Sequence, residues 1–247
     1  MRKGILYGVS VGTGDPELIT VKGLKILQNT RIIAFPAGVG ARSGLAEEII
    51  KNWLDEDQRT LKLHFPYTRD EKVLEQAWDE AAARVWPYLE RGEDVAFACE
   101  GDVNFYSTFT YLALTLKQKY AEAEVRTIPG VCSPMAAASS LGIPLTMRDE
   151  RLVILPALYS LEQLERAIEW ADVLVLMKVG SVYSRVWEFL KRKNLLRDSW
   201  IVERATFADQ VIYRDLLARP SLELSYFSLW IVRVRRDGLP KNLAAFP

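Results

Sequence analysis

The sequence has few of the residues that build metal sites and disulfide frameworks. It contains one histidine, His64, and two cysteines, Cys99 and Cys132, among 247 residues. One histidine excludes a multi-histidine metal site. Two cysteines so far apart fit no short metal-binding motif and no disulfide framework. We therefore expect no metal site, and a reducing compartment, the cytoplasm.

Net charge and long apolar runs are also missing. The 32 Lys and Arg residues balance the 32 Asp and Glu residues, which disfavours a wholly basic, nucleic-acid-binding surface. No apolar run reaches the roughly 18 residues of a membrane-spanning helix. The chain passes from Met1 into a strand-like run without a signal-peptide pattern. We expect neither a nucleic acid nor a membrane as a partner.

Strand-like and helix-like runs alternate through the first half of the chain. Val95–Cys99 is wholly apolar, which is typical of a strand buried on both faces. The pattern predicts a mostly parallel sheet with helices on both faces. The predicted strands are 4–11, 31–35, 61–65, 95–99 and 125–128, and the predicted helices are 18–28, 45–53, 70–90 and 106–120.

The second half follows a break at Pro129–Gly130 and a short helix of small residues over 135–140. Its last three predicted strands have no long helices between them, which indicates a mixed sheet. We therefore expect two α/β domains, 1–128 and 129–247, with a ligand cleft between them. The predicted strands here are 151–155, 173–177, 200–204, 210–214 and 226–235, and the predicted helices are 161–171 and 182–193.

A glycine-rich turn, Gly8–Pro16, follows the first predicted strand. Gly12 and Gly14 would let a ligand approach the backbone closely. The dinucleotide pattern G-x-G-x-x-G has Glu17 in the place of its third glycine, and Asp15 and Glu17 would repel a pyrophosphate, which disfavours a dehydrogenase. A tight turn with Asp15 capping the next helix explains the same residues equally well.

A second motif, Cys99–Thr108, follows the buried strand. Parallel sheets bind ligands beyond the carboxyl ends of their strands. Glu100 and Asp102 place two acids there, where they could accept from a ribose hydroxyl or pair with an ammonium group. A polar loop that ends in a helix cap is the alternative.

Three further motifs lie at the domain junction and at later strand ends: Pro129–Ala138, Leu176–Gly180 and Val202–Thr206. Each has a structural alternative. These are a tightly packed junction helix, a core methionine at Met177, and a surface ion pair between Glu203 and Arg204.

The five motifs, in this order, resemble those of the tetrapyrrole (corrin/porphyrin) methylase family, from about Ile5 to Arg235. The resemblance implies two α/β domains, S-adenosylmethionine as cofactor in the cleft between them, and a homodimer. Four stretches, 65–70, 78–83, 97–111 and 177–180, are most similar to members that methylate C20 of precorrin-2, or of its cobalt form, in cobalamin biosynthesis. That activity is the expected function.

The resemblance also implies which residues contact the cofactor. Family members more often have proline where this chain has Thr13. Members that methylate uroporphyrinogen carry an acid just after the second strand, where this chain has Pro36, so that activity is disfavoured. The expected cofactor-binding residues are Thr13, Glu100, Gly101, Asp102, Phe105, Ser107, Thr108, Cys132, Ser133, Met177 and Ala205.

The expected chemistry asks little of the protein beyond aligning the methyl donor with an electron-rich ring carbon. By position, Tyr106, Lys178 and Glu203 are candidates for a base that removes a proton afterwards. Arg42, Arg69 and Arg148 lie in predicted loops and are candidates for binding the carboxylates of a tetrapyrrole, although a solvated surface position explains each equally well. The alternatives are methylation of another ring carbon, of a protein side chain as in diphthamide biosynthesis, or a non-catalytic module that binds S-adenosylmethionine.

Overall fold

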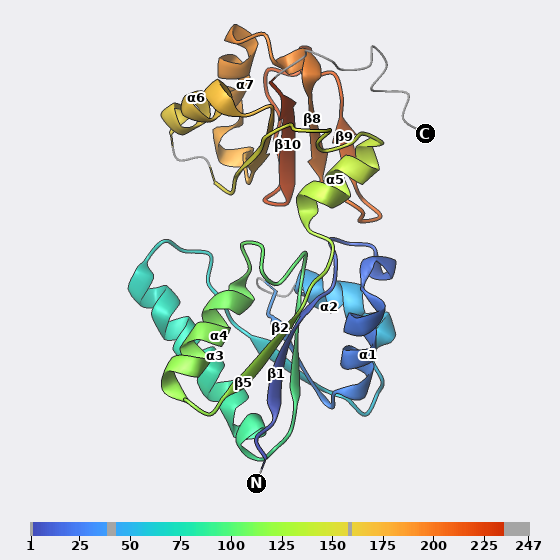
Figure 1. Ribbon diagram of the computed structural model, residues 1–247, viewed down its shortest axis with the longest axis vertical. Helices are drawn as coiled ribbons and strands as arrows, with labels where there is room; N and C mark the ends of the chain where they lie inside the picture. Colours follow the sequence, from blue (N-terminus) through green and yellow to red (C-terminus); the bar gives the residue numbers. More distant parts are fainter. Residues whose placement is uncertain (1, 39–42, 158–159, 235–247) are drawn as a thin grey trace. The chain divides into compact units, whose positions relative to one another are not determined.

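The computed structural model describes residues 2–38, 43–157 and 160–234. They form two α/β units, Met1–Cys132 and Ser133–Pro247 (Figure 1). The sequence pattern predicts a domain boundary after Ile128, whereas the break between the units follows Cys132. None of the helices in the described part of the chain is long and apolar enough to cross a membrane.

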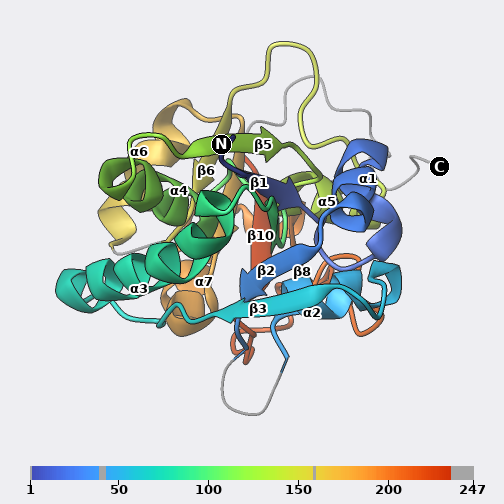
Figure 2. The same cartoon turned by 90° about the horizontal axis from the view of Figure 1, so that it is seen from below.

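The first unit is built on a parallel sheet of five strands in the order β3-β2-β4-β1-β5. Helices α3 and α4 cover one face of this sheet, and α1 and α2 cover the other (Figures 1 and 2). The predicted parallel sheet is therefore confirmed. Its elements are β1 (Ile5–Ser10), α1 (Val21–Asn29), β2 (Ile32–Pro36), α2 (Leu45–Ile50), β3 (Arg59–Leu63), α3 (Glu71–Glu90), β4 (Val95–Cys99), α4 (Thr108–Lys119) and β5 (Glu124–Ile128).

Helix α3 shows how the sequence sets these elements. The carboxylate of Asp70 caps the helix by accepting from the backbone N–H groups of Lys72 and Val73. Its buried alanines and larger apolar residues recur at helical spacing and pack on the sheet beside α4. The helix ends before Gly92, whose φ of +84° suits glycine.

The second unit holds a mixed sheet in the order β6-β7-β10-β8-β9, which confirms the prediction for this half. Strands β6 and β7 are parallel, and the other pairs are antiparallel. Helices α6 and α7 pack against one face, and α5 contacts β8 and β10. The elements are α5 (Ser133–Leu141), β6 (Leu152–Leu155), α6 (Leu161–Trp170), β7 (Val173–Met177), α7 (Tyr183–Arg192), β8 (Ser199–Glu203), β9 (Val211–Tyr213) and β10 (Ser228–Arg233).

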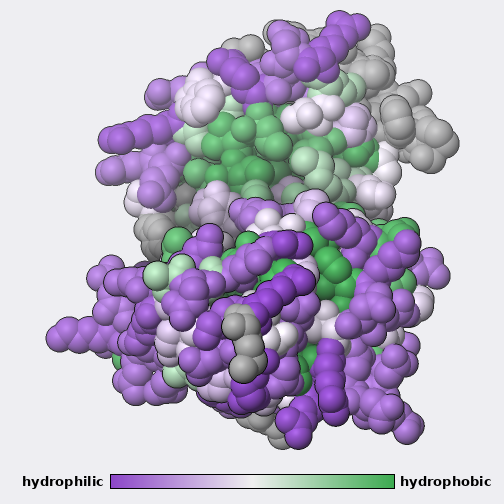
Figure 3. Space-filling model, turned by 60° about the horizontal axis from the view of Figure 1, so that its bottom comes forward, coloured by the Kyte–Doolittle hydropathy of each residue, from purple (hydrophilic) through white to green (hydrophobic). Residues whose placement is uncertain are grey.

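The two units differ in the surface that Figure 3 shows. Polar side chains cover most of the visible face of the first unit, whereas the visible face of the second unit carries a contiguous apolar area (Figure 3). In the second unit the apolar edge strand β6 is only half-buried along its whole length.

The starts of three predicted helices are wrong by two or more residues. The helix of small residues predicted over 135–140 begins at Ser133. The helix predicted from Leu18 begins at Val21, because Thr20 supplies the cap; Asp15 instead caps a 3-10 turn over Pro16–Leu18. The helix predicted from Tyr106 begins at Thr108, because Ser107 is its cap. Tyr106 lies outside the helix with a φ of +51°, a left-handed conformation that is uncommon for a tyrosine.

Candidate functional site

Strand pairing in the first unit brings three turns together at the carboxyl ends of its parallel strands, and this end of the sheet is the first edge. β1 lies between β4 and β5, with Ser10 paired to Cys99 and Val9 paired to Ile128. All three strands are parallel, so the turns that follow them leave the sheet side by side. These turns, 11–15, 100–107 and 129–132, contain three of the motifs found in the sequence.

Backbone contacts join the first two turns. The N–H of Val11 donates to the carbonyl oxygen of Cys99 over 2.9 Å, and the N–H of Gly101 donates to that of Gly12 over 2.6 Å. Gly12 and Gly101 both have positive φ, 76° and 71°, which glycine adopts without strain. The glycines of the two motifs therefore shape one continuous edge.

Asp102 joins the second turn to the third. Its Oδ1 accepts from the N–H of Asn104 and its Oδ2 accepts from the N–H of Gly130, each over 2.8 Å. Each carboxylate oxygen has a further lone pair, so Asp102 can hold these turns and still accept a bond from a ligand. The half-buried Glu100 is a second carboxylate in the same turn.

Ser10 is a residue of this edge that the sequence analysis does not identify. Its hydroxyl donates to the carbonyl oxygen of Ile128 over 2.7 Å and accepts from the N–H of Val103 over 2.9 Å. One signal was available: a serine that ends an otherwise apolar strand is buried and must find partners.

Ser107 has a structural task. Its Oγ accepts from the N–H of Phe109 as the cap of α4 and lies 2.9 Å from the Sγ of Cys99. Cys99 is buried, as expected, and burial, reinforced by the charge of Glu100, raises the pKa of its thiol well above the usual range. Cys99 is therefore a neutral packing residue. Thr108, the first residue of α4, is half-buried.

The first edge offers a small ligand an accessible stretch of backbone, hydrogen-bond acceptors and aromatic surface. Gly101 has open space within 4 Å of the position of an added Cβ, so a ligand can approach the backbone there. Glu100 and Asp102 supply acceptors for hydroxyl or ammonium groups. Phe105 stacks edge-on against Tyr106, with 4.7 Å between ring centroids, and places aromatic surface beside the acids. Thr13 and Cys132 are half-buried in the turns of the same edge.

The second unit has its own edge of strand ends. β10 lies antiparallel between β7 and β8, so the carboxyl ends of β7 and β8 flank Ser228 at the start of β10. Met177 ends β7, and the buried Ala205 follows β8. Ser133, the remaining expected cofactor contact, begins α5.

Backbone strain is concentrated at this second edge. Lys178, Arg204 and Thr206 all have positive φ, between 50° and 67°. Such residues cluster at functional sites, because the surrounding structure must hold them in place. The Lys178 ammonium lies 4.8 Å from the centroid of the Tyr226 ring, and the Arg204 Nε donates to Asp209 over 2.7 Å.

The Glu203 carboxylate is engaged on both oxygens. Oε1 accepts from the N–H of Ser225 over 2.6 Å, and Oε2 accepts from the hydroxyl of Tyr213 over 3.3 Å. Burial raises the pKa of Tyr213, and the adjacent carboxylate of Glu203 raises it further. These contacts hold the segment that leads into β10.

The candidate arginines lie in different units of the chain. Arg69 is exposed and precedes the cap of α3 in the first unit, whereas Arg148 is exposed in the second unit with a φ of +50°. Arg42 lies outside the described residues. Within the described part of the chain, no three His, Cys, Asp or Glu side chains gather into a group that could hold a metal ion.

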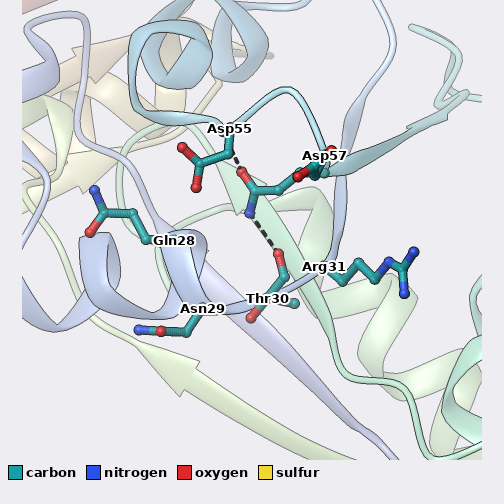
Figure 4. A pocket seen from close by; sticks show the side chains of 7 residues that line it. Gln28, Asn29, Thr30, Arg31, Asp55 and Asp57 are labelled. Atoms are coloured by element: carbon teal, nitrogen blue, oxygen red, sulfur yellow. Dashed lines mark hydrogen bonds between the residues drawn. The ribbon is translucent and has the colours of Figure 1, made fainter.

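A polar hollow lies at the opposite, amino-terminal edge of the first sheet (Figure 4). Gln58 crosses it, donating from Nε2 to the carbonyl oxygens of Leu27 and Thr30 and accepting from the N–H of Asp55. These bonds satisfy carbonyl oxygens at the carboxyl end of α1, so we assign the polar residues of the hollow a structural role. Its lining residues are Gln28, Asn29, Thr30, Arg31, Asp55, Asp57 and Gln58.

Comparisons with known proteins agree with this architecture. A model of the family Tetrapyrrole (Corrin/Porphyrin) Methylases matches residues 5–220. Uroporphyrin-III C-methyl transferase from Thermus thermophilus, solved with S-adenyl homocysteine, has a TM-score of 0.65 at 20% identity over 93% of this chain and 92% of its own. That likeness concerns the fold.

Three curated relatives are similar over nearly the whole chain. A probable cobalt-precorrin-2 C(20)-methyltransferase from Methanocaldococcus jannaschii is 33% identical over 92% of this chain and 95% of its own length. A precorrin-2 C(20)-methyltransferase from Sinorhizobium sp is 30% identical over 95% and 97%. The cobalamin biosynthesis protein CobIJ from Mycobacterium tuberculosis is 33% identical over 92% of this chain, which spans only 45% of that longer protein.

Proposed function

Because the chain belongs to the tetrapyrrole (corrin/porphyrin) methylase family, we propose that it transfers a methyl group from S-adenosylmethionine to C20 of precorrin-2 or cobalt-precorrin-2 in cobalamin biosynthesis. The observation that carries the proposal is the edge of three joined turns, in which Asp102 bonds Gly130. Similarity to C20-methyltransferases along nearly the whole chain supports the choice of ring carbon.

Bound S-adenosylmethionine supplies an electrophilic methyl group that needs no activation by the protein. The carboxylates of Glu100 and Asp102 serve as acceptors for its ribose hydroxyls or its ammonium group. The open side of Gly101 admits the ligand to the backbone. The remaining expected cofactor contacts are Thr13, Phe105, Ser107, Thr108, Cys132, Ser133, Met177 and Ala205.

The role of these residues is to fix the donor against an electron-rich carbon of the reduced macrocycle. Such alignment removes much of the entropic barrier to a reaction between two molecules. All three base candidates have contacts: both carboxylate oxygens of Glu203 accept hydrogen bonds, from Ser225 and Tyr213; Lys178 lies over the Tyr226 ring; and Tyr106 packs against Phe105. We therefore favour a structural role for Glu203 and keep Tyr106, whose side chain is exposed, as the candidate in the first unit.

The substrate carries several carboxylates, which arginine pairs with well. Arg69 and Arg148 are exposed and remain the candidates for this contact within the described residues. The proposal includes a homodimer in the cytoplasm, for which the family resemblance is the support.

Anaerobic incubation with S-adenosylmethionine and precorrin-2, in parallel with its cobalt complex, tests the activity. Product mass is the measurement. We expect the mass of one added methyl group with at least one substrate, and the preferred substrate shows whether cobalt is already in the ring. Tight binding of S-adenosylmethionine without transfer to either would contradict the substrate and favour another member activity or a non-catalytic module.

A further inference from the structure

Ser10 lies at the end of β1, the strand between β4 and β5. Its hydroxyl contacts the turn after β4 through Val103 and the last residue of β5 through Ile128. We propose that Ser10 is a positioning residue that holds the turns 100–107 and 129–132 in the arrangement that binds S-adenosylmethionine. This inference rests on the proposed function and adds to it a residue outside the expected cofactor contacts.

Burial makes the Ser10 hydroxyl hard to replace. The residue is 0% exposed, so water cannot take over its two hydrogen bonds. Removing the hydroxyl leaves the buried N–H of Val103 without its acceptor and the carbonyl of Ile128 without its donor. The same burial keeps Ser10 from touching a ligand, so any effect on binding must act through the turns.

Ser10 also sets the spacing of the edge by contact. A Cβ added to Gly130 would lie 2.4 Å from the Cβ of Ser10 and 3.4 Å from the carbonyl oxygen of Gly101. The backbone of the third turn therefore rests on the Ser10 side chain. The Asp102 carboxylate accepts from the N–H of the same glycine, so Gly130 is held by one side chain from β1 and by another from the turn after β4.

A loosened pair of turns predicts weaker binding. Without the Ser10 hydroxyl, the free protein would populate arrangements of the turns that do not bind the cofactor, and the apparent affinity would fall with the competent fraction. A bias of about 1.4 kcal/mol toward the arrangements that do not bind, which is within the net contribution of one hydrogen bond, corresponds to a decrease in apparent affinity of about tenfold. An accelerated exchange of the Val103 amide hydrogen would accompany it.

The test compares Ser10→Ala with Ser199→Ala. Ser199, the first residue of β8, is a matched control because it is also 0% exposed. Its hydroxyl donates to the carbonyl oxygen of Leu196. Calorimetric titration with S-adenosylhomocysteine gives affinity, hydrogen exchange gives Val103 protection, and thermal unfolding shows that each variant folds. We expect only Ser10→Ala to lose affinity and protection.

Wild-type affinity in a folded Ser10→Ala variant would overturn the inference, as would an equal loss in Ser199→Ala. If Ser10→Ala does not fold, Ser10→Cys keeps a weak donor and acceptor and should show an intermediate affinity; unchanged affinity would count against the inference. Failure of the wild-type chain to bind S-adenosylhomocysteine would instead contradict the proposed function.

Discussion

The carboxylate of Asp102 accepts a hydrogen bond from the backbone N–H of Gly130, with 2.8 Å between Oδ2 and the nitrogen. The two residues follow β4 and β5, which are not neighbours, because β1 lies between them. The bond therefore spans the end of β1 and fixes two turns of the proposed cofactor site against each other. A residue expected to bind the ligand is thus also part of the structure that shapes the site.

Replacing Asp102 with alanine is expected to weaken binding of S-adenosylhomocysteine at least about tenfold, because hydrogen bonds to a charged group are stronger than neutral ones. The fold should remain intact. Calorimetric titration, with circular dichroism to check folding, measures the change.

Asp94→Ala is the matched control for that variant. The carboxylate of Asp94 accepts from the N–H of Ile5 over 2.8 Å, at the opposite edge of the same sheet. It should lose stability without losing affinity. Full affinity in a folded Asp102→Ala variant would remove Asp102 from the site.

Gly101→Ala separates ligand contact from backbone strain. The added methyl group meets no protein atom within 4 Å, but φ is +71°, so the free energy of unfolding should fall by about 1 kcal/mol. The methyl group would also enter the space assigned to the cofactor and reduce affinity. Gly92→Ala, with φ at +84° and its added Cβ 2.9 Å from the carbonyl oxygen of Arg2, lies away from the site, so it should reduce stability more than Gly101→Ala does and leave affinity unchanged. Equal affinities in the two variants would contradict the placement.

Cys99 makes stability depend on alkaline pH. Its thiol has a pKa raised by burial, so the folded state keeps the proton after the unfolded chain has lost it. The contribution of this group is complete below the unfolded value near 9 and is lost progressively as pH rises above it. The free energy of unfolding, measured by urea titration at a series of pH values, should fall more steeply with pH above about pH 9 in wild type than in Cys99→Ser. Parallel curves would contradict the buried, neutral thiol.

Arg233 holds the segment that contains Arg148. Its Nη1 donates to both carboxylate oxygens of Glu150, and its Nη2 donates to the carbonyl oxygens of Pro144 and Leu145. The Arg233 side chain is 1% exposed and that of Glu150 is 18% exposed. Arg233→Met should therefore lower the free energy of unfolding by about 3 kcal/mol, measured by urea titration.

The control for Arg233 is Arg126→Met. Arg126 pairs with Glu124 on the exposed surface, where ion pairs contribute little. A loss of stability in both variants, or in neither, would show that burial does not set the strength of the Arg233 contacts.

Local patterns in the sequence predict most of the fold. Val95–Cys99 is recognisable as a buried strand because every residue is apolar, and the structure buries all five. The start of α4 was less visible, because Tyr106, Ser107 and Thr108 all suit the end of a turn. The left-handed φ of Tyr106 and the capping hydroxyl of Ser107, which accepts from the N–H of Phe109, place Tyr106 outside the helix.

The connections within the site depend on strand order, which a single sequence does not reveal. Gly101 and Asp102 could be proposed from their place after a strand. The roles of Ser10 and Gly130 follow only once β1 is known to lie between β4 and β5. Long-range pairing of this kind joins residues more than a hundred positions apart, as Ser10 and Ile128 show.

The position of the transferred methyl group tests the central proposal most directly. The chain would be incubated with S-adenosylmethionine labelled with carbon-13 in its methyl group and with the preferred form of precorrin-2. Carbon-13 NMR of the product should then show a single labelled methyl group on C20. A labelled methyl group on any other ring carbon would contradict the proposed activity while leaving the family and the cofactor site in place.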